Sequence, residues 1–349
     1  MCRNWSQVNR IAISLCLAAV TAVGAYAQAT PAPKPRKNPP VRVEMPAAPE
    51  PPDFPDRELH DHGVSEKALA VDANVNIKLP CISEAKVTIN GWDRNEIRVY
   101  IKNGGKFVFR VHEKDAVSGK PVWVLITPLV ADKAKSPMSD CIYGDRIEID
   151  VPMKASLSIK SYETETRIDS VKKVDIKNLG GKVALRNITG GITASTFEGD
   201  VTVENSGGQI SLETSTGNVV AYEVSPGQLG DTFKAKTNNG SITLQKVDHR
   251  QIEATSVSGS VIFNGKFLPG GLYTMNTSNG SIKLSIPGDS SCKIIAYYGY
   301  GTFNSELPLK TETENISQGG KSLVAKMGSG DATVNVTTSS GSIYFGKQP

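Results

Sequence analysis

The sequence predicts an all-β protein, most of which we expect to form a β-solenoid with coils of about 20 residues. Three observations favour this fold class. Thr, Ser, Val, Ile and Gly are plentiful, which suits short strands joined by tight turns. Long stretches alternate apolar and polar residues, and a glycine-led phrase recurs at a nearly constant period. The alternative is an antiparallel β-sandwich, because Asn-Gly is also a strong hairpin turn.

Residues 1–27 have the features of a secretory signal peptide. Arg3 and Arg10 make the start basic, residues 11–23 are apolar, and the Ala-Tyr-Ala at 25–27 fits the small-x-small cleavage pattern. We therefore expect export to the periplasm, the cell surface or the extracellular space, with a mature chain that begins at Gln28. Retention of this segment as a membrane anchor is the alternative. No later segment is long and apolar enough to span a bilayer.

Residues 28–66 are expected to form a Pro-rich, disordered linker. Half of the chain's 20 prolines fall between Pro31 and Pro55. Such a composition cannot build a packed core, so the segment should be extended and hold the folded part away from an anchoring point.

The charge balance gives no case for nucleic acid as a partner. The chain has 39 Lys and Arg residues against 35 Asp and Glu, and the signal segment contains two of the basic residues and no acidic one. The mature chain therefore has 37 basic and 35 acidic residues and a net charge of +2. We see no dense basic stripe with interleaved aromatic residues.

Residues 67–180 are expected to form the less regular N-terminal part of the β domain. Residues 85–90, 96–102, 106–111 and 122–126 alternate apolar and polar positions, and Asn and Gly residues bound several of them. This is the pattern of strands joined by turns. We find no convincing amphipathic helix in the mature chain.

Residues 181–349 are expected to form regular repeats. The recurring phrase is Gly, a small or polar residue, an aliphatic residue, any residue, and an apolar residue. It begins at Gly181, Gly199, Gly208, Gly217, Gly240, Gly259, Gly280, Gly330 and Gly341.

A ladder of glycines at 199, 217, 240, 259, 280, 301, 320 and 341 has spacings of 18, 23, 19, 21, 21, 19 and 21 residues. Gly301 and Gly320 are imperfect copies. A glycine at a tight corner can take a positive φ, and the two apolar residues that follow it point to one side of a strand. A single coil cannot bury that side, so we expect equivalent positions of neighbouring coils to stack.

The phrases resemble the bacterial "putative adhesin" family of β-strand-repeat proteins, a domain of unknown function related to the head GIN adhesin group. The resemblance covers about residues 70–349. It rests on residues 87–93 (VTINGWD), 96–99 (EIRV), 277–287 (TSNGSIKLSIP), 327–332 (MGSGDA) and 338–343 (TSSGSI). It implies a β-helix-like fold in a secreted or envelope-associated protein and supplies no catalytic residues.

Three cysteines remain in the mature chain: Cys81, Cys141 and Cys292. In an oxidising compartment, one pair and one spare cysteine are expected. Cys81 and Cys141 lie in the same less regular part and are the preferred disulfide pair. The alternative is three buried thiols that act as small apolar side chains. Their spacing suits no zinc site.

Two histidine-containing clusters are candidate sites. The His-Asp-His at 60–62 combines metal-binding residue types, but a flexible segment offers no fixed geometry, so we expect no metal there. The Asp-His-Arg at 248–250 has the residue types of general acid–base catalysis, but its position between repeats favours a surface turn. We therefore assign no catalytic, cofactor-binding or metal-binding residues.

Tyr297, Tyr298 and Tyr300 form an aromatic cluster with Phe303. Exposed on a flat sheet, these rings would stack on sugar rings or on a protein partner, so they are our possible binding surface. The alternative is that they fill the core or cap its end.

Two functions remain open from the sequence. The first is a non-catalytic, adhesin-like envelope protein that presents a repetitive surface to an envelope component, a glycan or a protein. The second is a β-helix carbohydrate-active enzyme, a polysaccharide lyase or hydrolase. Sugar hydrolysis needs paired carboxylates at a set separation, and a groove with three or more carboxylates would favour the enzyme. The polar positions rich in Thr, Ser and Lys favour the binding protein.

Overall fold

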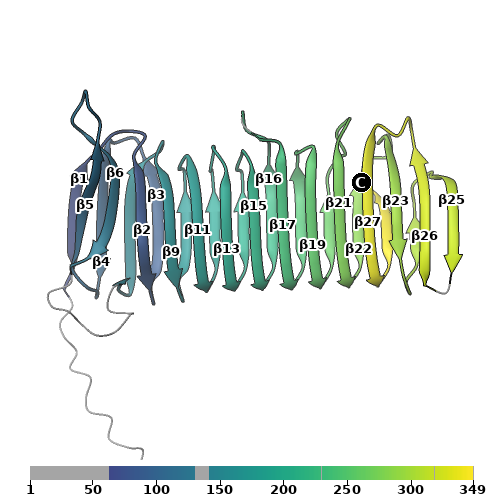
Figure 1. Ribbon diagram of the computed structural model, residues 1–349, viewed down its shortest axis with the longest axis horizontal. Helices are drawn as coiled ribbons and strands as arrows, with labels where there is room; N and C mark the ends of the chain where they lie inside the picture. Colours follow the sequence, from purple (N-terminus) through teal and green to yellow (C-terminus); the bar gives the residue numbers. More distant parts are fainter. Residues whose placement is uncertain (1–62, 130–140, 229, 318, 349) are drawn as a thin grey trace, which may run out of the picture. The chain divides into compact units, whose positions relative to one another are not determined.

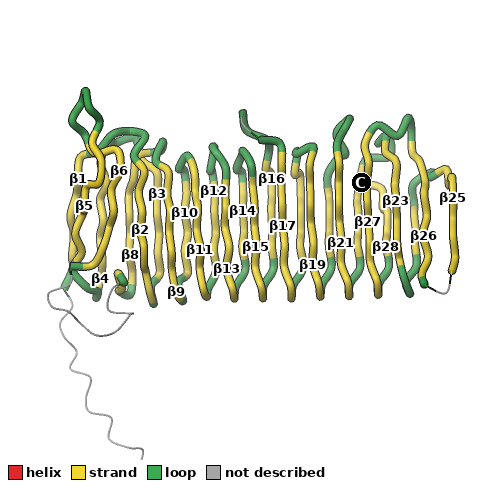
Figure 2. Tube along the Cα trace, viewed as in Figure 1, coloured by secondary structure: helices red, strands yellow, loops and turns green. Residues whose placement is uncertain are grey.

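The computed structural model describes residues 63–129, 141–228, 230–317 and 319–348. In this part of the chain the regular structure is entirely β, and the strands form two sheets (Figures 1 and 2). The His-Asp-His segment, the signal segment and nearly all of the expected linker lie outside the described residues. Ser65 and Glu66, at the end of the expected linker, already belong to the first strand.

The first sheet, sheet A, has 13 strands within the described residues. In spatial order they are β1 (Ser65–Ala70), β4 (Glu96–Lys102), β8 (Arg146–Pro152), β3 (Lys86–Trp92), β10 (Glu165–Asp169), β12 (Val183–Arg186), β14 (Val201–Glu204), β16 (Val219–Val224), β18 (Ile242–Val247), β20 (Val261–Asn264), β22 (Ile282–Ile286), β28 (Ile343–Lys347) and β24 (Phe303–Ser305).

The second sheet, sheet B, has 15 described strands. In spatial order they are β25 (Lys310–Ser317), β26 (Gly320–Met327), β23 (Cys292–Tyr298), β27 (Ala332–Ser340), β21 (Leu272–Asn279), β19 (Gln251–Ser258), β17 (Thr232–Asn239), β15 (Ile210–Thr216), β13 (Ile192–Glu198), β11 (Lys173–Gly180), β9 (Ser156–Tyr162), β2 (Asn76–Ser83), β6 (Pro121–Pro128) and β5 (Phe107–Lys114), with β7 (Ile142–Tyr143) paired to β2.

Each coil contributes one strand to sheet B and the next strand to sheet A, and successive coils pair in parallel (Figure 1). Equivalent apolar residues therefore stack directly: Val261 pairs with Ile282, and Ile282 pairs with Ile343. All three are fully buried between the sheets. The predicted β-solenoid and the predicted stacking of equivalent apolar positions are confirmed, and the sandwich alternative is not adopted.

The corner glycines explain why the coils keep this register. Gly240 has a φ of +153°, and a Cβ atom added to it would overlap the carbonyl oxygen of Gly217 in the preceding coil. Three residues before most corners, a buried Thr or Ser donates its hydroxyl to the preceding coil's glycine carbonyl, as Thr237 does to Gly217 at 2.9 Å. The T-x-x-G spacing thus joins each coil to its predecessor.

The last coil does not follow the order of the sequence. The coil formed by β27 and β28 lies between the coil of β21 and β22 and the coil of β23 and β24. Gly341 therefore stacks on Gly280, and Gly301 stacks on Gly341. The expected ladder is wrong at Gly320, which begins β26 in an antiparallel hairpin with β25 instead of forming a corner.

The recurring phrase can be recognised in the sequence from Gly181 onward, but parallel stacking begins earlier in the chain. β9 and β10 already pair with β11 and β12 in register. In this coil Thr164 stands in the place of the corner glycine, beneath Gly181, and the positive φ of +51° belongs to the preceding residue, Glu163. Antiparallel pairs are confined, within the described residues, to strands near both ends of the stack: β1, β4 and β8, β5 with β6, and β23, β25 and β26.

Candidate functional site

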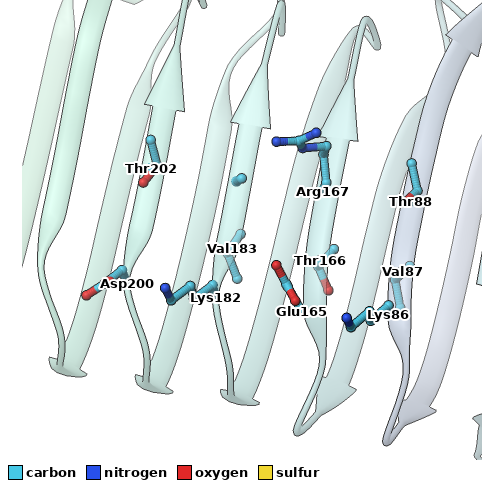
Figure 3. Close-up of a pocket in the computed structure, with 11 residues that line it drawn as sticks. Lys86, Val87, Thr88, Glu165, Thr166, Arg167, Lys182, Val183, Asp200 and Thr202 are labelled. Carbon is cyan, nitrogen blue, oxygen red and sulfur yellow. The ribbon is translucent and has the colours of Figure 1, made fainter. Parts of the chain in front are cut away.

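The inner faces of the two sheets form the core, so recognition chemistry has to lie on the outer faces. On sheet A, a groove of about 420 Å³ crosses β3, β10, β12 and β14 (Figure 3). Small and medium-sized side chains form the floor of the groove, and charged side chains border it. Its lining includes Lys86, Thr88, Glu165, Arg167, Lys182, Ala184, Asp200 and Thr202.

Four of these side chains occupy the same place in four adjacent coils. Lys86 and Glu165 are the first residues of paired strands. Lys182 and Asp200 precede the next two strands, and backbone bonds of 2.8 and 2.9 Å (Thr166 N to Lys182 O, Val183 N to Asp200 O) continue the ladder. The row therefore alternates basic, acidic, basic and acidic side chains (Figure 3).

A second row runs beside the first. Thr88 pairs with Arg167, Arg167 with Ala184, and Ala184 with Thr202. The long Arg167 side chain stands among short neighbours, which produces the hollow. The first row continues with Asn218, whose backbone N–H (2.8 Å) and side-chain amide (3.2 Å) both donate to Asp200 Oδ1.

The charges of this groove are not neutralised by ion pairs. Among the residues that the structure describes, no ion pair involves Lys86, Glu165, Arg167, Lys182 or Asp200. By contrast, Lys246 and Glu223, also on sheet A, are 2.7 Å apart. The groove thus offers three cationic donors and two carboxylates to a ligand. It has two carboxylates, fewer than the three or more that would favour a carbohydrate-active enzyme.

The structure does not place the three expected tyrosines on one surface. Tyr298 is only 4% exposed and points into the core, where its ring lies 5.9 Å from that of Phe303. Tyr297 is 40% exposed on the opposite side of the strand and donates its hydroxyl to Gly319 O at 2.7 Å. Tyr300 is 90% exposed in the following turn. The reason is the alternation of a strand: adjacent residues face opposite sides.

His249 is buried, which corrects the expectation of a surface turn at 248–250. Its ring is fully enclosed, and Nε2 lies 2.8 Å from Gly208 O, so Nε2–H donates and Nδ1 is left as an acceptor without a partner. Burial lowers the pKa of His249, against the opposing effects of the Gly208 bond, Asp231 and Asp248. Arg250 is exposed and pairs with Asp231 at 3.2 Å.

The structure joins Cys81 to Cys141 in a disulfide with Cα atoms 4.6 Å apart. It ties β2 to the residue that precedes β7. Cys292 is a buried free thiol, and burial raises its pKa to about 11, which keeps it protonated and unreactive. In the described part of the chain, no group of three or more His, Cys, Asp or Glu residues is placed to hold a metal ion.

No motif in the sequence marks the groove on sheet A. Lys182 and Asp200 could have been noticed, because each directly follows a glycine of the recurring phrase. Lys86 and Glu165 belong to coils without that glycine, so only the register shows that they join the same row.

A mostly parallel stack of two-strand coils with two open polar faces defines the class: a β-solenoid repeat protein. The model of the Toastrack DUF4097 family matches residues 67–344, and the chain belongs to this family. The resemblance noted from the sequence is thereby confirmed. Among curated proteins, none matches the chain.

Solved structures with some similarity include a "putative cell adhesion protein" from Clostridium sporogenes, with 14% identity, 82% of this chain and 100% of that chain covered, and a TM-score of 0.22. Two "putative adhesin" structures, from Parabacteroides distasonis and Parabacteroides merdae, have 12% and 11% identity and TM-scores of 0.30. They cover 81% of this chain and 98% and 96% of their own. Scores this low carry no argument about function.

Within the described residues, no helix has the length and apolar character needed to cross a membrane.

Proposed function

We propose that this protein is a non-catalytic, adhesin-like envelope protein whose β-solenoid binds an acidic glycan along the outer face of sheet A. The observation that carries the proposal is the row Lys86, Glu165, Lys182 and Asp200, none of which forms an ion pair within the described residues. Export and a spacer role for the Pro-rich segment that precedes β1 are parts of the same proposal.

The geometry suits an extended polymer. Neighbouring strands of a sheet are about 4.8 Å apart, so Lys86 and Lys182, two strands apart, are separated by about 10 Å along the stack. A chain that runs across the strands meets donors at this regular interval. Thr88 and Thr202 add hydroxyl groups beside the charged row.

The charge balance favours an acidic partner with a moderate salt dependence. Three cationic side chains against two carboxylates leave the groove with one excess positive charge. Carboxylates of a glycan can pair with Lys86, Arg167 and Lys182, while Glu165 and Asp200 accept hydrogen bonds from sugar hydroxyls. Because the net charge is small, affinity should fall only modestly between low and physiological salt.

The test measures binding of the exported protein to a panel of immobilised acidic and neutral polysaccharides. Lys86→Ala and Lys182→Ala should each weaken binding to an acidic polysaccharide by about tenfold. Lys283→Ala is the matched control, because Lys283 is exposed on sheet A outside the groove and should leave affinity unchanged. Equal affinities for all three variants and the parent would contradict the proposal.

The same panel tests the enzyme alternative. New reducing or unsaturated ends are followed over time. Steady product release that is abolished by Glu165→Gln or Asp200→Asn would replace the binding function with a lyase or hydrolase.

A further inference from the structure

A second groove lies on the outer face of sheet B, near the end where the antiparallel strands begin. Its volume is about 560 Å³, within the range of ligand sites. It crosses β5, β6, β2, β9 and β11. Its polar and aromatic lining comprises Asn76, Lys78, Glu113, Trp123, Ser156, Ser158, Lys173 and Asp175.

Register explains the shape of this groove. Trp123 pairs with Asn76, Asn76 with Ser156, and Ser156 with Lys173, so one row of side chains crosses four strands. Asn76 and Ser156 are short, whereas Trp123 and Lys173 at the two ends are long. The strand spacing of about 4.8 Å places these two walls about 14 Å apart, with a low floor between them.

The Trp123 ring is held in place, but its hydrogen-bonding capacity is unused. The His112 ring, 4.4 Å away at 73°, packs against it and holds it in place. The side chain is half-buried, and its indole N–H has no hydrogen-bond acceptor among the described residues. Trp92 differs, because its Nε1–H donates to Glu96 O at 2.8 Å. An indole with a free N–H at the wall of a polar groove is suited to a ligand that is apolar on one side and polar at its rim.

The charged residues of this groove are also unpaired. Lys78, Lys173, Glu113 and Asp175 take part in no ion pair within the described part of the chain. Farther along the same face, charged side chains neutralise one another, with Lys234 3.2 Å from Glu253 and Lys236 3.3 Å from Glu213. The two positive and two negative charges cancel, so the groove does not favour a ligand of either charge. It offers both hydrogen-bond donors and acceptors.

We infer that this groove binds a neutral oligosaccharide whose pyranose ring stacks on Trp123. The C–H face of a sugar ring is apolar and its hydroxyl rim is polar, which matches the indole and the hydrogen-bonding groups of the floor and far wall. Asp175 and Glu113 accept from hydroxyl groups, and Lys78, Lys173 and Asn76 donate to them. This site is separate from the sheet A groove and does not depend on the function proposed for it.

Tryptophan fluorescence tests the inference. In the Trp92→Phe variant of the exported protein, titration with cellotetraose and chitotetraose should give a saturable change in emission for at least one of them. Adding Trp123→Phe should abolish this emission change while calorimetry still detects binding, because a phenyl ring keeps an apolar face. Trp123→Ala should lower the calorimetric affinity about tenfold. Circular dichroism confirms that each variant is folded.

Lys86→Ala, which alters the sheet A groove, is the matched control and should leave neutral-sugar affinity unchanged. Three results would overturn the inference: no saturation with either neutral tetrasaccharide, unchanged affinity in Trp123→Ala, or binding that Lys86→Ala abolishes. An acidic tetrasaccharide that binds in preference to both neutral ones would also overturn it.

Discussion

The hydroxyl of Thr338 donates to the carbonyl oxygen of Gly280 at 2.9 Å, although 58 residues separate them in the chain. Thr277 makes the same bond to Gly259 at 2.8 Å across only 18 residues. The two bonds are equivalent in the stack, and the difference in separation arises because the strands from β23 to β26 intervene in the sequence but not in this part of the stack. The C-terminal coil is thus held inside the solenoid.

We expect Thr338→Val to destabilise the protein by about 1–2 kcal/mol, because valine fills the space but leaves the Gly280 carbonyl without this donor. Chemical denaturation measures the loss. Thr337→Val is the matched control: Thr337 is the neighbouring residue on the outer face of β27, and its replacement should change stability by less than about 0.5 kcal/mol. Equal losses in the two variants would contradict a role for the Thr338 bond.

The general fold could be predicted from the sequence because the corner itself is constrained. A residue with a side chain at Gly240 would meet the backbone of Gly217, which explains why a glycine recurs at this corner throughout the regular coils. The order of the last coils could not be predicted, because every coil offers its neighbours the same parallel edge. The residues around these glycines do not show whether Gly341 or Gly301 stacks on Gly280.

The candidate site was less predictable, since it depends on register. Lys86 and Glu165 are 79 residues apart and become neighbours only through the pairing of β3 with β10. The tyrosines show the opposite case: alternation within Cys292–Tyr298 was sufficient to place Tyr297 and Tyr298 on opposite faces.

The overlap at the corners predicts the effect of Gly240→Ala. Its φ of +153° and the nearby Gly217 carbonyl should together lower stability by about 1–3 kcal/mol. Gly270→Ala is the control, because Gly270 has a φ of +70° but open space around a Cβ atom, and should lose about 1 kcal/mol. Thermal denaturation of both variants separates steric overlap from backbone strain; a smaller loss at Gly240 would show that the coils shift apart freely.

Ile282 is stacked between Val261 and Ile343 and is fully buried. Ile282→Asp should lose several kcal/mol, because it places an unpaired carboxylate in the core. Lys283→Asp, at the next and exposed position of β22, should remain within about 0.5 kcal/mol of the parent. If the Ile282→Asp variant melts like the parent, the inward assignment of this row is incorrect.

Export with cleavage after Ala27 remains a prediction from the sequence. Mass spectrometry of the exported protein should find Gln28 at the N-terminus. Arg3→Glu with Arg10→Glu should reduce export, because it reverses the charge of the n-region, whereas Lys34→Glu, in the Pro-rich segment, should not. Exported protein that retains Met1 would show that the segment is kept as an anchor.

His249 predicts a pH dependence of stability. Burial lowers its pKa in the folded state below the ordinary value of 6.5, so the neutral ring is favoured in the fold. As the pH falls below 6.5, the unfolded chain binds the proton more readily than the folded one, and stability is lost toward and through the lowered pKa.

His249→Gln removes this titration. Between pH 7 and pH 5, the melting temperature of the parent should therefore fall more steeply than that of His249→Gln. Thr337→Val, which changes no titratable group, is the control and should keep the steeper slope of the parent. Parallel slopes for the parent and His249→Gln would show that His249 does not contribute.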